Sequence, residues 1–196
     1  GRVFIDLETN GKYERQGHLD TVISQHSFSD IPIIKKSISD AALLVRLNPL
    51  HGDSAQEVES AINLGADLLM LPMFKTSEQL EEFSNLVGGR VGIIPLVETH
   101  SAMLDMHNIV KVPGLSEVFI GLNDLHLDMG LHFMFEPLAN GMLEKTFQVI
   151  MDSGLPFGFG GVARVGEGLI PGELVLGEHV RLGSSSVILS RTFNRG

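Results

Sequence analysis

The sequence predicts an α/β protein, and within that class a (β/α)₈ TIM barrel, from three observations. Seven short apolar runs recur along the 196 residues, and most are continuous, as in parallel strands that are covered on both faces. Segments with apolar residues at helical spacing separate the runs. Four residues, each at or just beyond the end of a run, follow one another at intervals of 26 residues: Arg46, Pro72, Glu98 and Asp124. That interval fits one strand–loop–helix–loop unit.

The expected strands are the apolar runs themselves. In chain order they cover residues 3–5, 41–45, 68–71, 91–97, 118–120, 157–159 and 187–189. Because a closed barrel of this class has eight strands, we expect this chain to lack its first βα unit. An open doubly wound sheet is the alternative, and the absence of a Gly-rich turn after an early strand favours the barrel.

Two of the expected helices have start signals. Ser54 with Glu57, and Thr76 with Gln79, have the spacing of a capping box. In a capping box, side chains bond the free amides of the first helical turn. We therefore expect helices to begin at these two places.

Composition indicates a single acidic domain over residues 1–196. Lys and Arg number 14 against 24 Asp and Glu, which gives a net charge of −10. This charge disfavours nucleic acid and anionic membrane surfaces as partners. The absence of Cys excludes disulfides and cysteine zinc sites and fits a reducing compartment, so we expect a cytoplasmic protein. The chain starts at Gly1 without a Met, so we expect an upstream segment, with a removed targeting peptide as one alternative.

Polar side chains end several of the expected strands, where TIM-barrel enzymes place their catalytic groups. These residues are Asp6, Glu8, Arg46, Glu98, Asn123 and Asp124. Carboxylates this close together repel one another unless a cation lies among them. Mg²⁺ or Mn²⁺ is usually held by one or two carboxylates plus water and substrate oxygens, and Glu98 and Asp124 are the candidate ligands. The alternative is that both acids form salt bridges or loop caps.

Arg46 directly follows four apolar residues, so its guanidinium needs an anionic partner. That partner is a substrate carboxylate or, in a structural ion pair, Glu8 or Glu98. His100 and His126 stand just past the candidate metal ligands. Each is a candidate general base or outer partner of the metal, with a solvated loop histidine as the alternative.

Glycines near the end of the chain form a weak phosphate-loop motif. Gly158 lies on the sixth expected strand and Gly160 and Gly161 directly follow it, while residues 183–186 precede the seventh. Glycines let backbone amides approach a phosphate, but a strand glycine also simply makes room for neighbouring side chains. If the loop binds phosphate, Ser190 and Arg191 would add a cationic contact.

Several strings of residues together resemble the HpcH/HpaI aldolase and citrate lyase β-chain family, from about Val3 to about Phe193. They are Phe4-Ile5-Asp6-Leu7-Glu8, Leu44-Val45-Arg46, Gly65-Ala66-Asp67 through Leu71-Pro72-Met73, Val97-Glu98-Thr99 and Gly121-Leu122-Asn123-Asp124-Leu125. The resemblance implies a metal-dependent barrel that lacks its first strand, and it leaves open whether the last helix is present. Because that helix packs against a neighbouring subunit in relatives, the resemblance also implies a homo-oligomer.

The resemblance also implies roles for single residues. Glu98 and Asp124 match the family's Mg²⁺ or Mn²⁺ ligands, and Arg46 matches the arginine that contacts a 2-oxo acid. The amides of the segment formed by Gly121, Leu122 and Asn123 match the cradle for the substrate carboxylate. Asp6 and Glu8 match the acidic end of the family's second strand.

The chain departs from the aldolase branch of the family at two positions. Thr9 stands where that branch has a His that assists proton transfer, and Leu96 stands where it has a Gln. These departures indicate a divergent subgroup.

We therefore expect a divalent-metal-dependent carbon–carbon lyase of the class II aldolase type, which cleaves a 4-hydroxy-2-oxo acid to pyruvate and an aldehyde through a metal-stabilised enolate. Arg46 would stabilise the enolate charge. Water on the metal, guided by Asp6 or Glu8, would take the hydroxyl proton, with His126 as the second candidate. One alternative is a citrate-lyase-like lyase or hydrolase of a coenzyme A thioester. The other is a catalytically degenerate barrel that binds a small carboxylate.

Overall fold

The computed structural model describes residues 1–11, 25–164, 166–168, 170–189 and 193. Its seven strands are all parallel and pair in chain order, as an open barrel in the α/β class. They are β1 (Arg2–Asp6), β2 (Ala42–Arg46), β3 (Leu68–Leu71), β4 (Gly92–Val97), β5 (Val118–Ile120), β6 (Phe157–Val162) and β7 (Ser186–Leu189). Each strand coincides with or overlaps one of the seven apolar runs, which confirms the predicted order of elements.

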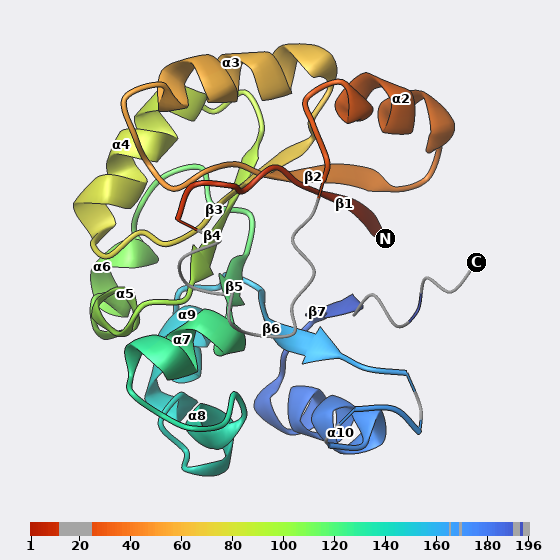
Figure 1. Ribbon diagram of the computed structural model, residues 1–196. Coiled ribbons are helices and arrows are strands. Elements are labelled where there is room, and N and C mark those ends of the chain that lie inside the picture. The colour runs from red at the N-terminus through yellow and green to blue at the C-terminus, as the bar shows by residue number, and fades with distance from the viewer. Residues whose placement is uncertain (12–24, 165, 169, 190–192, 194–196) are drawn as a thin grey trace.

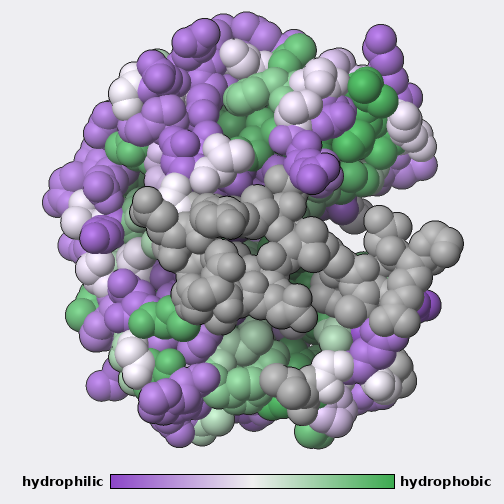
Figure 2. All heavy atoms as spheres, viewed as in Figure 1, coloured by the Kyte–Doolittle hydropathy of each residue, from purple (hydrophilic) through white to green (hydrophobic). Residues whose placement is uncertain are grey.

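The helices lie outside the arc of strands (Figure 1). They are α2 (Asp30–Ser37), α3 (Ser54–Leu64), α4 (Ser77–Val87), α5 (His100–Leu104), α6 (Met106–Ile109), α7 (Leu122–Asp128), α8 (Glu136–Ala139), α9 (Glu144–Asp152) and α10 (Gly172–Leu182). The outer surface over α3 and α4 is mostly hydrophilic, as expected for helices that bury one face only (Figure 2). Among the described residues, no helix is both long and apolar enough to cross a membrane.

Two apolar cores lie on the two faces of the sheet. The larger lies between the strands and the helices and includes Leu43, Val45 and Phe83. The smaller fills the inside of the barrel and consists of Leu44, Met70, Ile94, Leu96 and Phe119. Because successive residues of a strand point to opposite faces, residues 43 and 45 face the helices while residue 44 faces inward.

The helix starts differ in detail from the predicted capping boxes. α3 begins at Ser54 itself, after Asp53, and its cap makes no side-chain hydrogen bond. The capping-box prediction for Ser54 is therefore wrong: its hydroxyl accepts the amide of His51 instead. Thr76 does precede α4 but makes no capping bond, and Gln79 accepts the amide of Lys75. Other local donors compete successfully for these side chains.

A buried acid joins the first strand to the last. Glu117, 1% exposed, precedes β5 and bonds both Arg2 of β1 and Ser186 of β7. Within the described part of the chain, no backbone pairing joins β1 to β7. The Glu117 carboxylate therefore links the two edge strands at the amino-terminal end of the barrel.

Glu117→Ala is expected to lower the free energy of unfolding by about 2 kcal/mol. Breaking a fully buried pair costs roughly 3–5 kcal/mol, and the cost here is smaller because Arg2 keeps access to water. Urea denaturation measures the loss. The matched control is Glu59→Ala, which breaks a surface pair with Arg90 and should cost less than about 1 kcal/mol. Equal losses in the two variants would contradict the role of Glu117.

Candidate active site

Successive side chains of a strand point to opposite faces of the sheet, and this alternation places polar side chains at the carboxyl-terminal mouth of the barrel. Leu44 and Leu96 face the barrel interior, so Arg46 and Glu98, two residues further along their strands, extend on the same inner face. Phe4 also packs against this inner core, and Asp6 lies two residues beyond it on the same face of the sheet. The strand period therefore brings these three residues to one place.

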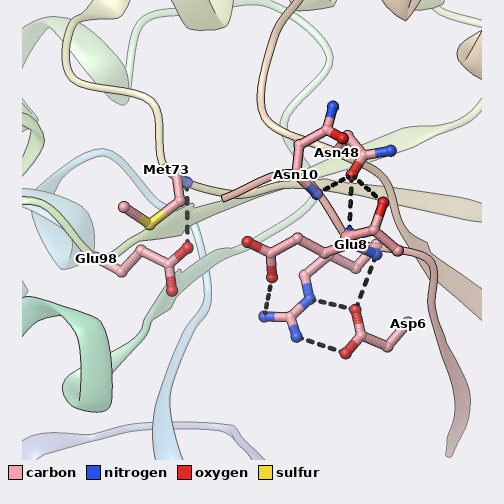
Figure 3. A network of polar contacts seen from close by, with 8 residues as sticks. Asp6, Glu8, Asn10, Asn48, Met73 and Glu98 are labelled. Atoms are coloured by element: carbon pink, nitrogen blue, oxygen red, sulfur yellow. Dashed lines mark hydrogen bonds and ion pairs between the residues drawn. The ribbon is translucent and has the colours of Figure 1, made fainter. Parts of the chain in front are cut away.

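Two carboxylates, those of Asp6 at the end of β1 and of Glu8 just beyond it, hold the guanidinium of Arg46 (Figure 3). Its Nε and Nη2 donate to Asp6 Oδ1 and Oδ2 at 2.9 and 2.7 Å, in the paired geometry that suits a guanidinium. Its Nη1 lies 3.4 Å from Glu8 Oε2. The structural ion pair expected with Glu8 is present, and Asp6 is an additional and closer partner.

These contacts keep Arg46 charged. Burial acts to lower the pKa of Arg46, but the hydrogen bonds that it donates to Asp6 and the negative charge of Glu8 outweigh burial and raise the pKa above its usual value. Asp6 and Glu8 are themselves buried, at 6% and 2% exposed. A permanent positive charge therefore lies at the mouth of the barrel.

Glu98 is buried beside this cluster. Its Oε1 accepts the backbone amide of Met73 at 3.1 Å. Met73 has φ 55°, in the left-handed region that costs a side-chain-bearing residue about 1–2 kcal/mol. The strained turn after β3 thus aims an amide at this carboxylate, and backbone strain of this kind concentrates at functional sites.

The pKa of Glu98 is raised to about 8. Burial is the largest cause, the charge of Asp124 is the next, and the charge of Arg46 opposes both. Asp124 is the third residue of α7 and is 8% exposed. The two acids predicted as metal ligands therefore lie close enough to repel each other in a buried site.

This donor set fits a hard divalent cation. Two buried carboxylates that repel each other are stabilised by a cation between them, and Mg²⁺ typically binds one or two carboxylates together with water and substrate oxygens. No cluster of three or more acids or histidines suited to a metal occurs among the residues that the structure describes. Glu98 and Asp124 are two buried carboxylates of the kind that such an ion binds.

Gly121 allows Glu98 to lie where it does. A Cβ at Gly121 would stand 2.8 Å from Glu98 Oε2 and 2.9 Å from Glu98 Cβ, closer than such atoms approach. The Gly121 amide donates to Val97 O at 2.9 Å, so it extends the strand pairing. The other two residues of the predicted carboxylate cradle, Leu122 and Asn123, are the first two residues of α7. Backbone amides in the first turn of a helix have no acceptor within that helix.

The remaining predicted residues lie in varied places. His126 is buried in α7, and its Nδ1 is 3.2 Å from Leu122 O. His100 is exposed at the start of α5, and its amide donates to Asp128. A Cβ at Gly158 would strike Ser186 and Phe119, so this glycine makes room for its neighbours. Ser190 and Arg191 lie outside the described residues.

Sequence reasoning missed Asn48. This side chain is 8% exposed and accepts hydrogen bonds from the loop after β1 (Figure 3). Its Nδ2 donates to Glu57 of α3. It stands two residues beyond Arg46, so the strand period that located Arg46 could have indicated it.

Comparison with known proteins identifies relatives. Residues 3–137 match the family described as HpcH/HpaI aldolase/citrate lyase. A hydroxypyruvate/pyruvate aldolase of Agrobacterium fabrum (strain C58 / ATCC 33970) is 28% identical over 130 residues, 61% of this chain and 48% of that protein. A pyruvate kinase of Agrobacterium vitis is 25% identical over 95 residues, 48% of this chain and 19% of that protein. The chain thus matches about half of the first relative's length and about a fifth of the second's.

Solved structures share the fold. An HpcH/HpaI aldolase/citrate lyase family protein from Burkholderia cenocepacia J2315 has a TM-score of 0.70 at 16% identity, over 95% of this chain and 77% of that one. The HpcH/HpaI aldolase from Desulfitobacterium hafniense DCB-2 has a TM-score of 0.68 at 19% identity, over 85% of this chain and 73% of that one. The protein CitE from Mycobacterium tuberculosis, in complex with magnesium and pyruvate, has a TM-score of 0.65 at 16% identity, over 96% of this chain and 75% of that one.

Glu98→Gln is expected to stabilise the metal-free protein at neutral and alkaline pH. The pKa of Glu98 is about 8 in the folded protein against an ordinary 4.5, so the folded state holds this proton more tightly than the unfolded chain. Stability from this group is complete below pH 4.5 and is lost as pH rises towards 8. The free energy of unfolding of the variant should therefore rise relative to that of the wild type between pH 4.5 and 8. Above pH 8 the difference should be roughly 2–4 kcal/mol. Denaturation in EDTA between pH 5 and 9 measures the gain, and parallel pH profiles would contradict it.

Gly121→Ala is expected to displace the Glu98 side chain and to lower the free energy of unfolding by about 1–3 kcal/mol, because the added methyl overlaps that carboxylate. Thermal and urea denaturation measure the effect. The control is Gly177→Ala in α10, where an added Cβ meets nothing within 4 Å. That variant should be neutral or more stable, since alanine favours a helix more than glycine does. A loss in the control as large as that in Gly121→Ala would show that the Glu98 contact is not the cause.

Proposed function

The chain belongs to the HpcH/HpaI aldolase/citrate lyase family, and we propose that it is a divalent-metal-dependent carbon–carbon lyase that cleaves a 4-hydroxy-2-oxo acid to pyruvate and an aldehyde. One observation carries the proposal: Glu98 and Asp124 are buried together beside the guanidinium of Arg46, so close that the charge of Asp124 raises the pKa of Glu98. The hydroxypyruvate/pyruvate aldolase relative supports a pyruvate-type substrate over other acids.

Glu98 and Asp124 would hold Mg²⁺ or Mn²⁺ at the mouth of the barrel. When bound, the ion supplies Lewis-acid polarisation of the substrate carboxylate and its neighbouring oxygen. The fixed amide of Met73 orients the Glu98 carboxylate, and Gly121 leaves it room. The amides of Leu122 and Asn123 would bind the substrate carboxylate at the start of α7.

Arg46 supplies the fixed positive charge of the mechanism. Cleavage of the carbon–carbon bond leaves negative charge on the pyruvate fragment, and a preorganised cation beside that charge lowers the barrier. Asp6 and Glu8 hold the guanidinium in place before substrate arrives. The site therefore needs little reorganisation when charge develops.

The hydroxyl proton of the departing aldehyde needs a base. We assign this step to Asp6 or Glu8, acting through water, because both lie beside Arg46 and Thr9 stands where the aldolase branch has a His. His126 is the second candidate. If its Nδ1 carries the proton that faces Leu122 O, its Nε2 is left as an acceptor.

The test is an assay of pyruvate release from a panel of 4-hydroxy-2-oxo acids with added Mg²⁺ or Mn²⁺. We expect turnover that EDTA abolishes and that the metal restores. Glu98→Gln and Asp124→Asn should each lower metal affinity at least about tenfold, as measured by calorimetry, because each removes a charged ligand.

Three outcomes separate the proposal from its alternatives. Cleavage of coenzyme A thioesters without aldolase activity would favour the citrate-lyase-like reaction. Tight binding of pyruvate or oxaloacetate with no turnover and no effect of EDTA would indicate a carboxylate-binding barrel. Metal binding that survives both substitutions would overturn the assignment of Glu98 and Asp124.

A further inference from the structure

Asn48 gathers three hydrogen bonds from the loop that follows β1. Its Oδ1 accepts the backbone amides of Thr9 at 2.8 Å and Asn10 at 2.9 Å, and the Thr9 hydroxyl at 3.3 Å. Backbone amides that a strand no longer pairs need another acceptor. One buried side-chain oxygen therefore serves two successive peptide groups of this loop (Figure 3).

Glu57 determines which way the Asn48 side chain faces. Asn48 Nδ2 donates to Glu57 Oε1 at 2.6 Å, and the Glu57 side chain is largely buried, at 15% exposed. If the Asn48 amide turned over, its oxygen would face the carboxylate and its NH₂ would face two N–H groups. Both contacts would be repulsive, so Glu57 selects the orientation that binds the loop.

The loop that Asn48 binds carries Glu8. Thr9 follows Glu8 directly, so the bond to the Thr9 amide fixes the peptide group on the carboxyl side of Glu8. The Glu8 amide donates to Asp6 Oδ1 at 3.2 Å, which fixes the peptide group on the other side. The Glu8 side chain then lies 3.4 Å from Arg46 Nη1. The end of β2 thus holds the loop twice, through the Arg46 side chain and through Asn48.

We propose that Asn48 is a positioning residue for the reaction, which places Glu8 against Arg46, and that Glu57 keeps Asn48 in the orientation this requires. The proposal rests on the proposed function, in which Glu8 helps to move the proton and holds Arg46. Asn48 acts through Glu8 rather than on the substrate. A displacement of the loop therefore lowers kcat more than it changes substrate binding.

The experiment compares Asn48→Leu with a double variant, Asn48→Asp with Glu57→Gln. Leucine has a similar size but accepts no hydrogen bond. In the double variant, the carboxylate introduced at position 48 can accept both loop amides, and the side-chain amide introduced at position 57 can donate to it. The pair then keeps its bonds and its total charge with the roles exchanged. The single variant Glu57→Gln and the wild type complete the set.

Two measurements are made on each protein: kcat and KM for metal-dependent pyruvate release, and hydrogen exchange of the amides of Thr9 and Asn10. For Asn48→Leu we expect a fall in kcat of about 10- to 100-fold with a smaller change in KM, and exchange at least about tenfold faster. The double variant should return both readouts to within about threefold of the wild type. The control is Asn63→Leu, which removes a similar Asn–Glu contact on the exposed face of α3 and should change neither readout.

The outcomes distinguish this inference from the proposed function. If the wild type releases no pyruvate, the proposed function fails, and the exchange measurement alone decides whether Asn48 holds the loop. Unchanged exchange and kcat in Asn48→Leu would overturn the inference. So would a double variant that folds with the wild-type melting temperature yet stays as impaired as Asn48→Leu.

Discussion

The site is governed by the need to balance negative charge at the mouth of the barrel. Among the described residues, Asp6, Glu8, Glu98 and Asp124 lie there with the guanidinium of Arg46. Asp6 and Glu8 are satisfied by Arg46 through three of its nitrogens. Glu98, next to Asp124, has its pKa raised to about 8 instead. A divalent cation near Glu98 and Asp124 would offset the repulsion that raises this pKa.

The barrel produces this cluster by simple geometry. Parallel strands end at one edge, and every second residue faces the interior. The inward-facing positions of a strand therefore fill the inner core along its length and carry the polar side chains of the cluster at its end. Backbone contacts then adjust each acid: Met73 donates to Glu98, and Asn48 holds the loop next to Glu8. The geometry of this cluster therefore depends on contacts between loops and side chains that follow the neighbouring strand.

Much of the fold and part of the site could be predicted from the sequence. Continuous apolar runs indicated the seven described strands. The polar residues at the strand ends included Arg46, Glu98 and Asp124, which the structure brings together. The capping box at Ser54 failed because His51 competes for that hydroxyl. Asp6 as the main partner of Arg46 also escaped prediction, because it depends on the register that sets residue 6 beside residue 46.

By itself, then, the sequence determined the class of fold, the order of its elements and the residue types at the strand ends, because these follow from local periodicity and composition. Only the tertiary structure decided which acids neutralise Arg46, which acid holds its proton to about pH 8, and which glycine must lack a side chain. Those properties depend on distances between strands that are far apart in the chain. Burial and charge interaction change steeply with such distances, so a pattern along one chain does not specify them.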